Sequence, residues 1–204
     1  MEVVAAGHRG LLPGPGSRAL DVSSGVGRNA LFLLKRGLDV RSIVYPDASG
    51  AQLAFQRKWA GRYRQTCPGT GSIDVVPGEF ARYDLGDHPV DLVVCVNSLM
   101  YAPLAIGREA ILHWQRQTRA GGLHLITTYT IEDGYHGRAS VSDGTFVTSG
   151  RPEDDELQRL YPATDWEHLG SSSRSVSTTK DSRSRRRARS VIIARKRAIP
   201  SAGR

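Results

Sequence analysis

The residues with the clearest capacity for chemistry form a glycine-rich turn at positions 21–29, which reads Asp-Val-Ser-Ser-Gly-Val-Gly-Arg-Asn. An apolar run precedes this turn and a helical pattern follows it, so we expect it to join a buried strand to a helix. Gly25 and Gly27 permit positive φ and let a ligand approach the backbone. In an open parallel sheet such a turn lies at the carboxyl ends of the strands, where ligands bind. The same residues also suit an ordinary strand-to-helix turn, so both interpretations stay open at this point.

The elements that must position this turn alternate between strand and helix. The expected strands cover residues 18–22, 39–44, 73–76, 90–96 and 123–129, and the expected helices cover residues 29–36, 52–64, 108–118 and 153–161. This alternation predicts an α/β fold with a Rossmann-like, doubly wound, mostly parallel sheet. Two later strands, at 166–169 and 190–194, are expected to add a terminal antiparallel pair and to bring the sheet to about seven strands.

The chain is expected to form one domain with short flanking segments. Residues 1–17 are an N-terminal segment, residues 18–197 the domain and residues 198–204 a C-terminal tail. Residues 131–152 are polar, glycine-rich and too long for a simple connection, so we expect a lid-like insertion there. The Ser/Arg-rich residues 171–189 are expected to form a basic loop between the last two strands.

The net charge of +8 suggests a nucleic-acid partner, but the charge is unevenly placed. Residues 1–170 hold 17 Lys+Arg against 19 Asp+Glu, whereas residues 171–204 hold 11 basic residues and one acid. A solvated strand face and a site for an anionic partner both explain this basic segment. No aromatic residue follows Trp166, so the segment offers no platform for base stacking. Nucleic-acid binding through residues 171–189 is therefore an alternative that the sequence does not favour.

The sequence has no pattern typical of membrane insertion, export or disulfide cross-linking. No apolar run approaches the ~18 residues of a spanning helix, and the first residues lack the basic and apolar regions of a secretory signal. Cys67 and Cys95 are too few for a disulfide framework and lack the spacing of a metal site. We therefore expect a cytoplasmic protein with no membrane partner and no bound metal.

Four segments of the chain occur in an order that a known family shares. The first, residues 19–40, contains a strand, an aspartate, the glycine-rich turn, an Arg-Asn pair and an apolar helix that ends before Gly-Leu-Asp-Val. The others cover residues 91–101, 119–126 and 156–161. Through these segments the chain resembles the class I S-adenosylmethionine-dependent methyltransferases, and most of all the tellurite-resistance methyltransferase family.

This resemblance implies that the cofactor is S-adenosylmethionine and that the partner is a small-molecule methyl acceptor. A chalcogen oxyanion or a thiol-like nucleophile is the acceptor that the family suggests. Positioning and desolvation do most of the catalysis in such an in-line displacement. A soft anionic acceptor needs no dedicated general base.

The resemblance also assigns site residues. It implies that the cofactor-binding residues are Asp21, Ser23, Ser24, Gly25, Gly27, Arg28, Asn29, Val44, Asp47, Glu79, Phe80, Asn97 and Ser98. The turn would hold the methionine end, and the amides that begin the next helix suit its carboxylate. Glu79 would accept from the adenine amino group, Asn97 and Ser98 would flank the sulfonium, and Tyr101 would position the acceptor as the candidate catalytic residue. A solvated acid, a turn cap and a packing residue are the structural alternatives for Glu79, Asn97 and Tyr101.

Three departures from the family pattern bear on cofactor binding. Ser23 and Ser24 replace glycine and cysteine, and a serine at the first position is strained by about 1–3 kcal/mol if its φ is positive. Val44 stands where the family has an acidic residue that binds the ribose hydroxyls, at a cost of about 1.5–3 kcal/mol, and Asp47 is the nearest substitute. Only 20 residues precede Asp21, whereas relatives have longer N-terminal helices over the cofactor.

These departures keep a second hypothesis open, in which a methyltransferase-like fold with weakened cofactor binding acts as a binding or accessory protein. A nicotinamide dinucleotide enzyme fits less well, because Ala30 stands at the third glycine of the Gly-x-Gly-x-x-Gly motif and Val44 replaces the acid that binds the ribose.

Overall fold

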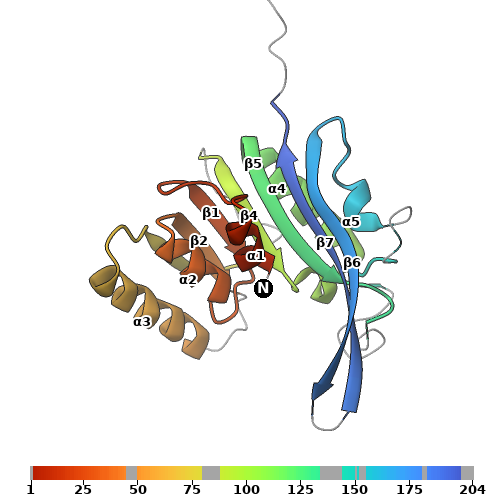
Figure 1. The fold of residues 1–204 in the computed structure, drawn as a ribbon, viewed down its shortest axis with the longest axis horizontal. Helices are drawn as coiled ribbons and strands as arrows, with labels where there is room; N and C mark the ends of the chain where they lie inside the picture. The colour runs from red at the N-terminus through yellow and green to blue at the C-terminus, as the bar shows by residue number, and fades with distance from the viewer. Residues whose placement is uncertain are drawn as a thin grey trace, which may run out of the picture.

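One seven-stranded sheet forms the centre of the fold (Figure 1). The computed structural model describes residues 2–44, 50–79, 88–133, 144–149, 151, 155–180 and 183–198, and for the strand residues 171–180 and 183–187 it describes the backbone. The strands are β1 (Arg18–Val22), β2 (Asp39–Val44), β3 (Ile73–Pro77), β4 (Val90–Val96), β5 (Thr118–Tyr129), β6 (Trp166–Lys180) and β7 (Arg183–Lys196). Their order is β3-β2-β1-β4-β5-β7-β6, with the first five parallel and the last two antiparallel. The predicted fold class is confirmed.

Helices cover both faces of this sheet. They are α1 (Glu2–His8), α2 (Arg28–Lys35), α3 (Gly50–Thr66), α4 (Leu104–Gln117) and α5 (Glu156–Arg159), with a 3-10 turn η1 (Leu99–Tyr101). The first three pack on one face, where Leu33 and Leu34 meet Leu92 of β4. α4 and α5 pack on the other face, where Trp114 meets Val93. Because β4 is buried on both faces, it is an apolar run without alternation. No helix among the described residues is long and apolar enough to cross a membrane.

The Ser/Arg-rich segment differs from its prediction. It was expected to be a loop over residues 171–189, but β6 and β7 continue through it and pair from Trp166 with Lys196 to Lys180 with Arg183. Since β5 pairs with β7 only as far as Arg189, the remainder is a two-stranded ribbon that extends from the sheet (Figure 1). The loop prediction is wrong because it assumed that a strand has to contain apolar residues, and this segment is polar. Backbone pairing between the two strands is enough to extend them beyond the sheet.

The described part of the predicted lid-like insertion is anchored to the core. Phe146 is completely buried against α4, where a Cβ on Gly107 would lie 2.5 Å from its ring. Thr148 bridges to Thr130 at the end of β5. Residues 134–143, 150 and 152 of this segment lie outside the described residues, so a lid role stays a prediction.

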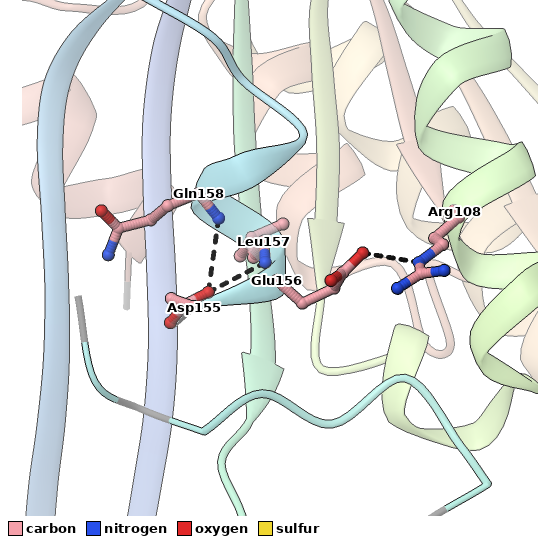
Figure 2. Close-up of polar contacts among 5 residues, drawn as sticks. All are labelled: Arg108, Asp155, Glu156, Leu157 and Gln158. Carbon is pink, nitrogen blue, oxygen red and sulfur yellow. Dashed lines mark hydrogen bonds and ion pairs between the residues drawn. The ribbon is translucent and has the colours of Figure 1, made fainter. Parts of the chain in front are cut away.

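Asp155 fixes the start of α5 (Figure 2). Its Oδ1 accepts hydrogen bonds from the backbone N–H groups of Leu157 at 2.9 Å and Gln158 at 3.3 Å. Its Oδ2 accepts from the hydroxyl of Ser190 on β7 at 2.5 Å. The buried carboxylate therefore caps the helix and joins it to the sheet.

Replacing Asp155 by alanine is expected to lower the free energy of unfolding by about 2 kcal/mol, because the change removes a cap and leaves a buried hydroxyl without its acceptor. Urea unfolding measures this loss. The ion pair between Arg108 Nε and Glu156 Oε1, which lie 2.6 Å apart, provides the control, because the Arg108 side chain is exposed (Figure 2). Arg108→Ala should cost clearly less, because water screens exposed ion pairs. Equal losses in the two variants would contradict this account.

Candidate functional site

The predicted site residues gather where the parallel strands end. The register pairs Val22 of β1 with Cys95 of β4, and Cys95 with Ile126 of β5. Each group of predicted residues follows one parallel strand at its carboxyl end. The glycine-rich turn follows β1, Glu79 follows β3, and the pair Asn97–Ser98 follows β4. The structure thus places them along one edge of the sheet, as the sequence predicts. The predicted cofactor residues Asp47 and Phe80 lie outside the described residues.

Left-handed backbone conformations shape the glycine-rich turn. Ser23 has a φ of 52°, Gly25 of 56° and Gly27 of 79°. The turn is tied to β2 by the N–H of Ser24, which donates to the carbonyl of Ile43 at 2.8 Å. Gly27 then caps α2, whose exposed first residue is Arg28. Ser23 therefore has the positive φ at which a serine is strained.

We expect Ser23→Gly to raise the free energy of unfolding by about 1 kcal/mol. The left-handed conformation costs a non-glycine residue about 1–2 kcal/mol, and the greater freedom of glycine in the unfolded chain offsets part of this gain. Chemical denaturation measures the change. Ser24→Gly is the matched control and should lower stability, because its hydroxyl has polar partners in the fold. A destabilised Ser23→Gly protein would show that Ser23 is not strained.

Asp21 is a completely buried carboxylate at the end of β1. Its Oδ2 accepts a hydrogen bond from the backbone N–H of Ala30 at 2.9 Å. Its Oδ1 is buried without a hydrogen-bond partner among the described residues. Burial raises the pKa of this carboxyl from 3.8 to about 7, although the Ala30 N–H and the Asn29 side chain oppose the shift. A buried acceptor that lacks a donor beside an open glycine turn suits a ligand that carries a cationic N–H group.

A buried polar cluster, absent from the predicted site, supports the turn from α3 and β2. The amide nitrogen of Gln56 donates to the carbonyl of Gly25 at 2.7 Å and to the Ser24 hydroxyl at 2.9 Å. The hydroxyl of Ser42 lies 2.7 Å from both the Ser24 hydroxyl and Gln56 Oε1. Gln56 falls four residues before the buried Ala60, on the packed face of its helix. That spacing was the one sequence signal that could have identified it.

Among the described residues, the end of β2 presents no carboxylate. Val44 is completely buried, and its carbonyl accepts a hydrogen bond from the N–H of Gly78 at 3.0 Å. The residue predicted at the ribose position thus packs in the interior. On the next strand, Glu79 is exposed directly beyond β3. The described residues therefore fit the amino-acid end of the predicted cofactor better than its ribose.

The segment after β4 combines a held amide with an exposed phenol. Asn97 has a φ of 56°, and its Oδ1 accepts from the Thr127 hydroxyl at 3.1 Å while its N–H donates to that hydroxyl at 3.0 Å. Ser98 is almost completely buried. Tyr101 on η1 is 55% exposed, so the alternative that it packs in the core is wrong. An Asn in this conformation, locked by β5, is typical of a functional edge.

Comparison with known proteins identifies the family. A family profile described as a methyltransferase domain matches residues 19–122, which include the glycine-rich turn and β4. The chain therefore belongs to the methyltransferase domain family, whose members use S-adenosylmethionine. The predicted family and cofactor are confirmed. No match was found among curated protein sequences.

Solved structures share the fold at low sequence identity. TehB from Haemophilus influenzae superposes with a TM-score of 0.68 and 19% identity, over 96% of this chain and 61% of its own length. A SAM-dependent methyltransferase from Methanosarcina mazei gives 0.66 and 17%, over 94% and 97%. The magnesium protoporphyrin IX methyltransferase of Synechocystis was solved with bound SAH (S-adenosylhomocysteine). It gives a TM-score of 0.63 and 14% identity, over 96% of this chain and 80% of its own length. This chain thus spans about three fifths of TehB.

Proposed function

We propose that this chain transfers the methyl group of S-adenosylmethionine to a soft small-molecule nucleophile, either a chalcogen oxyanion or a thiol-like atom. The observation that carries the cofactor half of this proposal is Asp21 Oδ1, a buried acceptor at the glycine-rich turn that has no hydrogen-bond donor among the described residues. The methionine ammonium is a donor of the required charge. The acceptor half draws on the family resemblance and on the polar edge formed by Asn97, Ser98 and Tyr101.

The residues of the chain divide the work of binding and positioning. Asp21 would hold the ammonium, and the N–H groups of Arg28 and Asn29 at the start of α2 would receive the carboxylate. The hydrogen bonds from Gln56 keep the turn in the left-handed shape that opens its backbone to a ligand. Asn97, fixed by Thr127, would flank the reacting centre.

S-adenosylmethionine supplies an electrophilic methyl group, which bonds to a lone pair of the acceptor as the bond from the methyl carbon to sulfur breaks. The protein has to align the acceptor and exclude water for this displacement. Tyr101 would do so from η1, where its exposed ring borders the edge. Because a soft anion already has an available lone pair, none of the described residues has to act as a general base.

A methyl-transfer assay with tellurite, selenite and a low-molecular-weight thiol tests the acceptor class. Transfer to at least one of these acceptors by the wild-type protein, with a KM for S-adenosylmethionine raised about ten- to a hundredfold in Asp21→Asn, supports the proposal. Tyr101→Ala should raise KM for the acceptor about tenfold through lost contact area, whereas Tyr101→Phe should stay near the wild type. An unchanged KM in Tyr101→Ala would remove Tyr101 from the acceptor site.

The second candidate is a methyltransferase-like binding or accessory protein, which the buried Val44 at the ribose position favours. It predicts cofactor binding too weak to measure, together with no transfer to any acceptor. A cytoplasmic location remains part of the proposal and is supported by Cys67 and Cys95, which are both free thiols.

A further inference from the structure

Helices α2 and α3 lie side by side on one face of the sheet (Figure 1). Their exposed residues form a strongly basic surface. Residues 22–38 and 48–73, which contain both helices, have no acidic residue. Their basic residues are all exposed, namely Arg28, Lys35, Arg36, Arg57, Lys58, Arg62 and Arg64. We call this surface the α2–α3 face. Because the whole of residues 1–170 holds more acids than bases, the positive charge here is a local concentration.

Aromatic rings are set among these charges. Phe55, Trp59 and Tyr63 follow one another at four-residue spacing along α3, with ring centroids 6.1 and 5.8 Å apart. Phe55 is 44% exposed and the other two are half-buried. Helical geometry places residues at this spacing in one row. A groove of about 440 Å³ runs between the row and α2, where Val26 and Phe32 line it.

Cations accompany three of these rings. The ammonium of Lys35 lies 4.9 Å from the ring centroid of Tyr63, and the guanidinium of Arg62 lies 5.1 Å from that of Trp59. On α2, Arg36 lies 5.8 Å from the ring of Phe32. The face thus combines aromatic rings with neighbouring cations, rather than charge alone.

We propose that the α2–α3 face binds single-stranded nucleic acid. Proteins that bind single strands stack bases on aromatic side chains and track the phosphates with Lys and Arg, which is the combination present here. Charge complementarity identifies a polyanion, and the partly exposed aromatic row selects one that has flat bases. The basic segment 171–189 has no aromatic residue, so it offers no ring on which a base could stack. The proposal is independent of methyl transfer.

Intrinsic fluorescence gives a direct test, because Trp114 and Trp166 are buried and Trp59 is the partly exposed tryptophan. Titration of the full-length chain with a mixed-sequence, single-stranded RNA 12-mer at low salt should quench this fluorescence and raise the anisotropy of a labelled strand. Trp59→Ala should weaken the affinity about ten- to a hundredfold, as the loss of one base stack does. Circular dichroism and the thermal midpoint verify that the variant is folded.

Charge variants separate stacking from general attraction. Lys58→Glu combined with Arg62→Glu should weaken binding and reduce its salt dependence. Arg116→Glu, an exposed residue on α4 across the sheet, should leave both unchanged. Absence of binding at low salt would overturn the proposal. So would affinity that survives Trp59→Ala but is lost when Arg185, Arg186 and Arg187 become serine. Equal affinity for polyglutamate, with an equal loss in Trp59→Ala, would assign the face to an acidic protein instead.

Discussion

Asp21→Asn is expected to weaken S-adenosylmethionine binding about ten- to a hundredfold while it stabilises the ligand-free protein at about pH 8. The weaker binding follows from the loss of a charged hydrogen-bond acceptor, worth about 1.5–3 kcal/mol. The gain in stability follows because the native carboxylate is completely buried and one of its oxygens has no hydrogen-bond partner among the described residues. Asparagine keeps an oxygen that can accept from the Ala30 N–H. Binding and stability should therefore move in opposite directions.

The direction of the pH dependence follows from the raised pKa of Asp21. Its carboxyl loses its proton at about pH 7 in the folded protein and near 3.8 when unfolded. Between these values the folded state holds more protons, so the contribution of Asp21 to stability falls as pH rises. From about pH 5 to 8 the wild type should lose on the order of 3 kcal/mol relative to Asp21→Asn. Urea unfolding of both proteins at the two pH values isolates this difference, because the other groups cancel.

Asp39→Asn is the matched control at the opposite edge of the sheet. Hydrogen bonds from the hydroxyl and backbone N–H of Ser72 lower the pKa of Asp39, which is the reverse of the shift at Asp21. Its stabilising contribution should therefore be lost as pH falls, and cofactor affinity should not change. An Asp21→Asn protein that binds the cofactor as tightly as the wild type would contradict the role assigned to Asp21.

Gly27→Ala is expected to lower both stability and cofactor affinity, the latter by more than tenfold. A side chain at a φ of 79° is strained by about 1–3 kcal/mol. The new Cβ would also lie 2.5 Å from Cδ of Gln56, so the amide that bonds to Gly25 and Ser24 has to move. Thermal denaturation and a cofactor titration measure the two losses.

Gly25→Ala separates strain from the steric clash. Gly25 has a φ of 56°, and a Cβ there would meet no atom within 4 Å. Its substitution should therefore cost only the backbone strain. If Gly25→Ala and Gly27→Ala lost equal stability, the clash with Gln56 would cost nothing. Gln56 would then not be the support of the turn. Adding Gln56→Ala to Gly27→Ala should recover part of the stability by removing the clash.

The sequence predicted the central sheet well, because hydrophobic periodicity reports burial. The limits of β1, β2 and β4 agree with the prediction, since turn residues bound these strands and apolar residues fill most of β1 and β4. The ribbon of β6 and β7 was missed because it is held by the pairing of one strand with the other and not by buried apolar residues at a regular spacing. Periodicity carries no information about such pairing.

The candidate site was predictable only where local sequence determines geometry. The glycine-rich turn is such a case, and so is the strain at Ser23, since positive φ is a local property. Gln56 could not be placed in the site, because its contact with Ser24 joins residues 32 positions apart. Burial of Val44 and exposure of Tyr101 likewise depend on how the whole domain packs. Residue type alone therefore could not decide between their functional and structural roles.

Calorimetric titration of the full chain with S-adenosylhomocysteine at about pH 6 and pH 8 tests the central claim most directly. We expect micromolar binding with a stoichiometry of one. The affinity should be higher at pH 8, and at pH 6 binding should release a proton, because Asp21 has to ionise to receive the ammonium. The absence of binding at millimolar ligand would contradict the account and would favour a methyltransferase-like fold that has lost its cofactor.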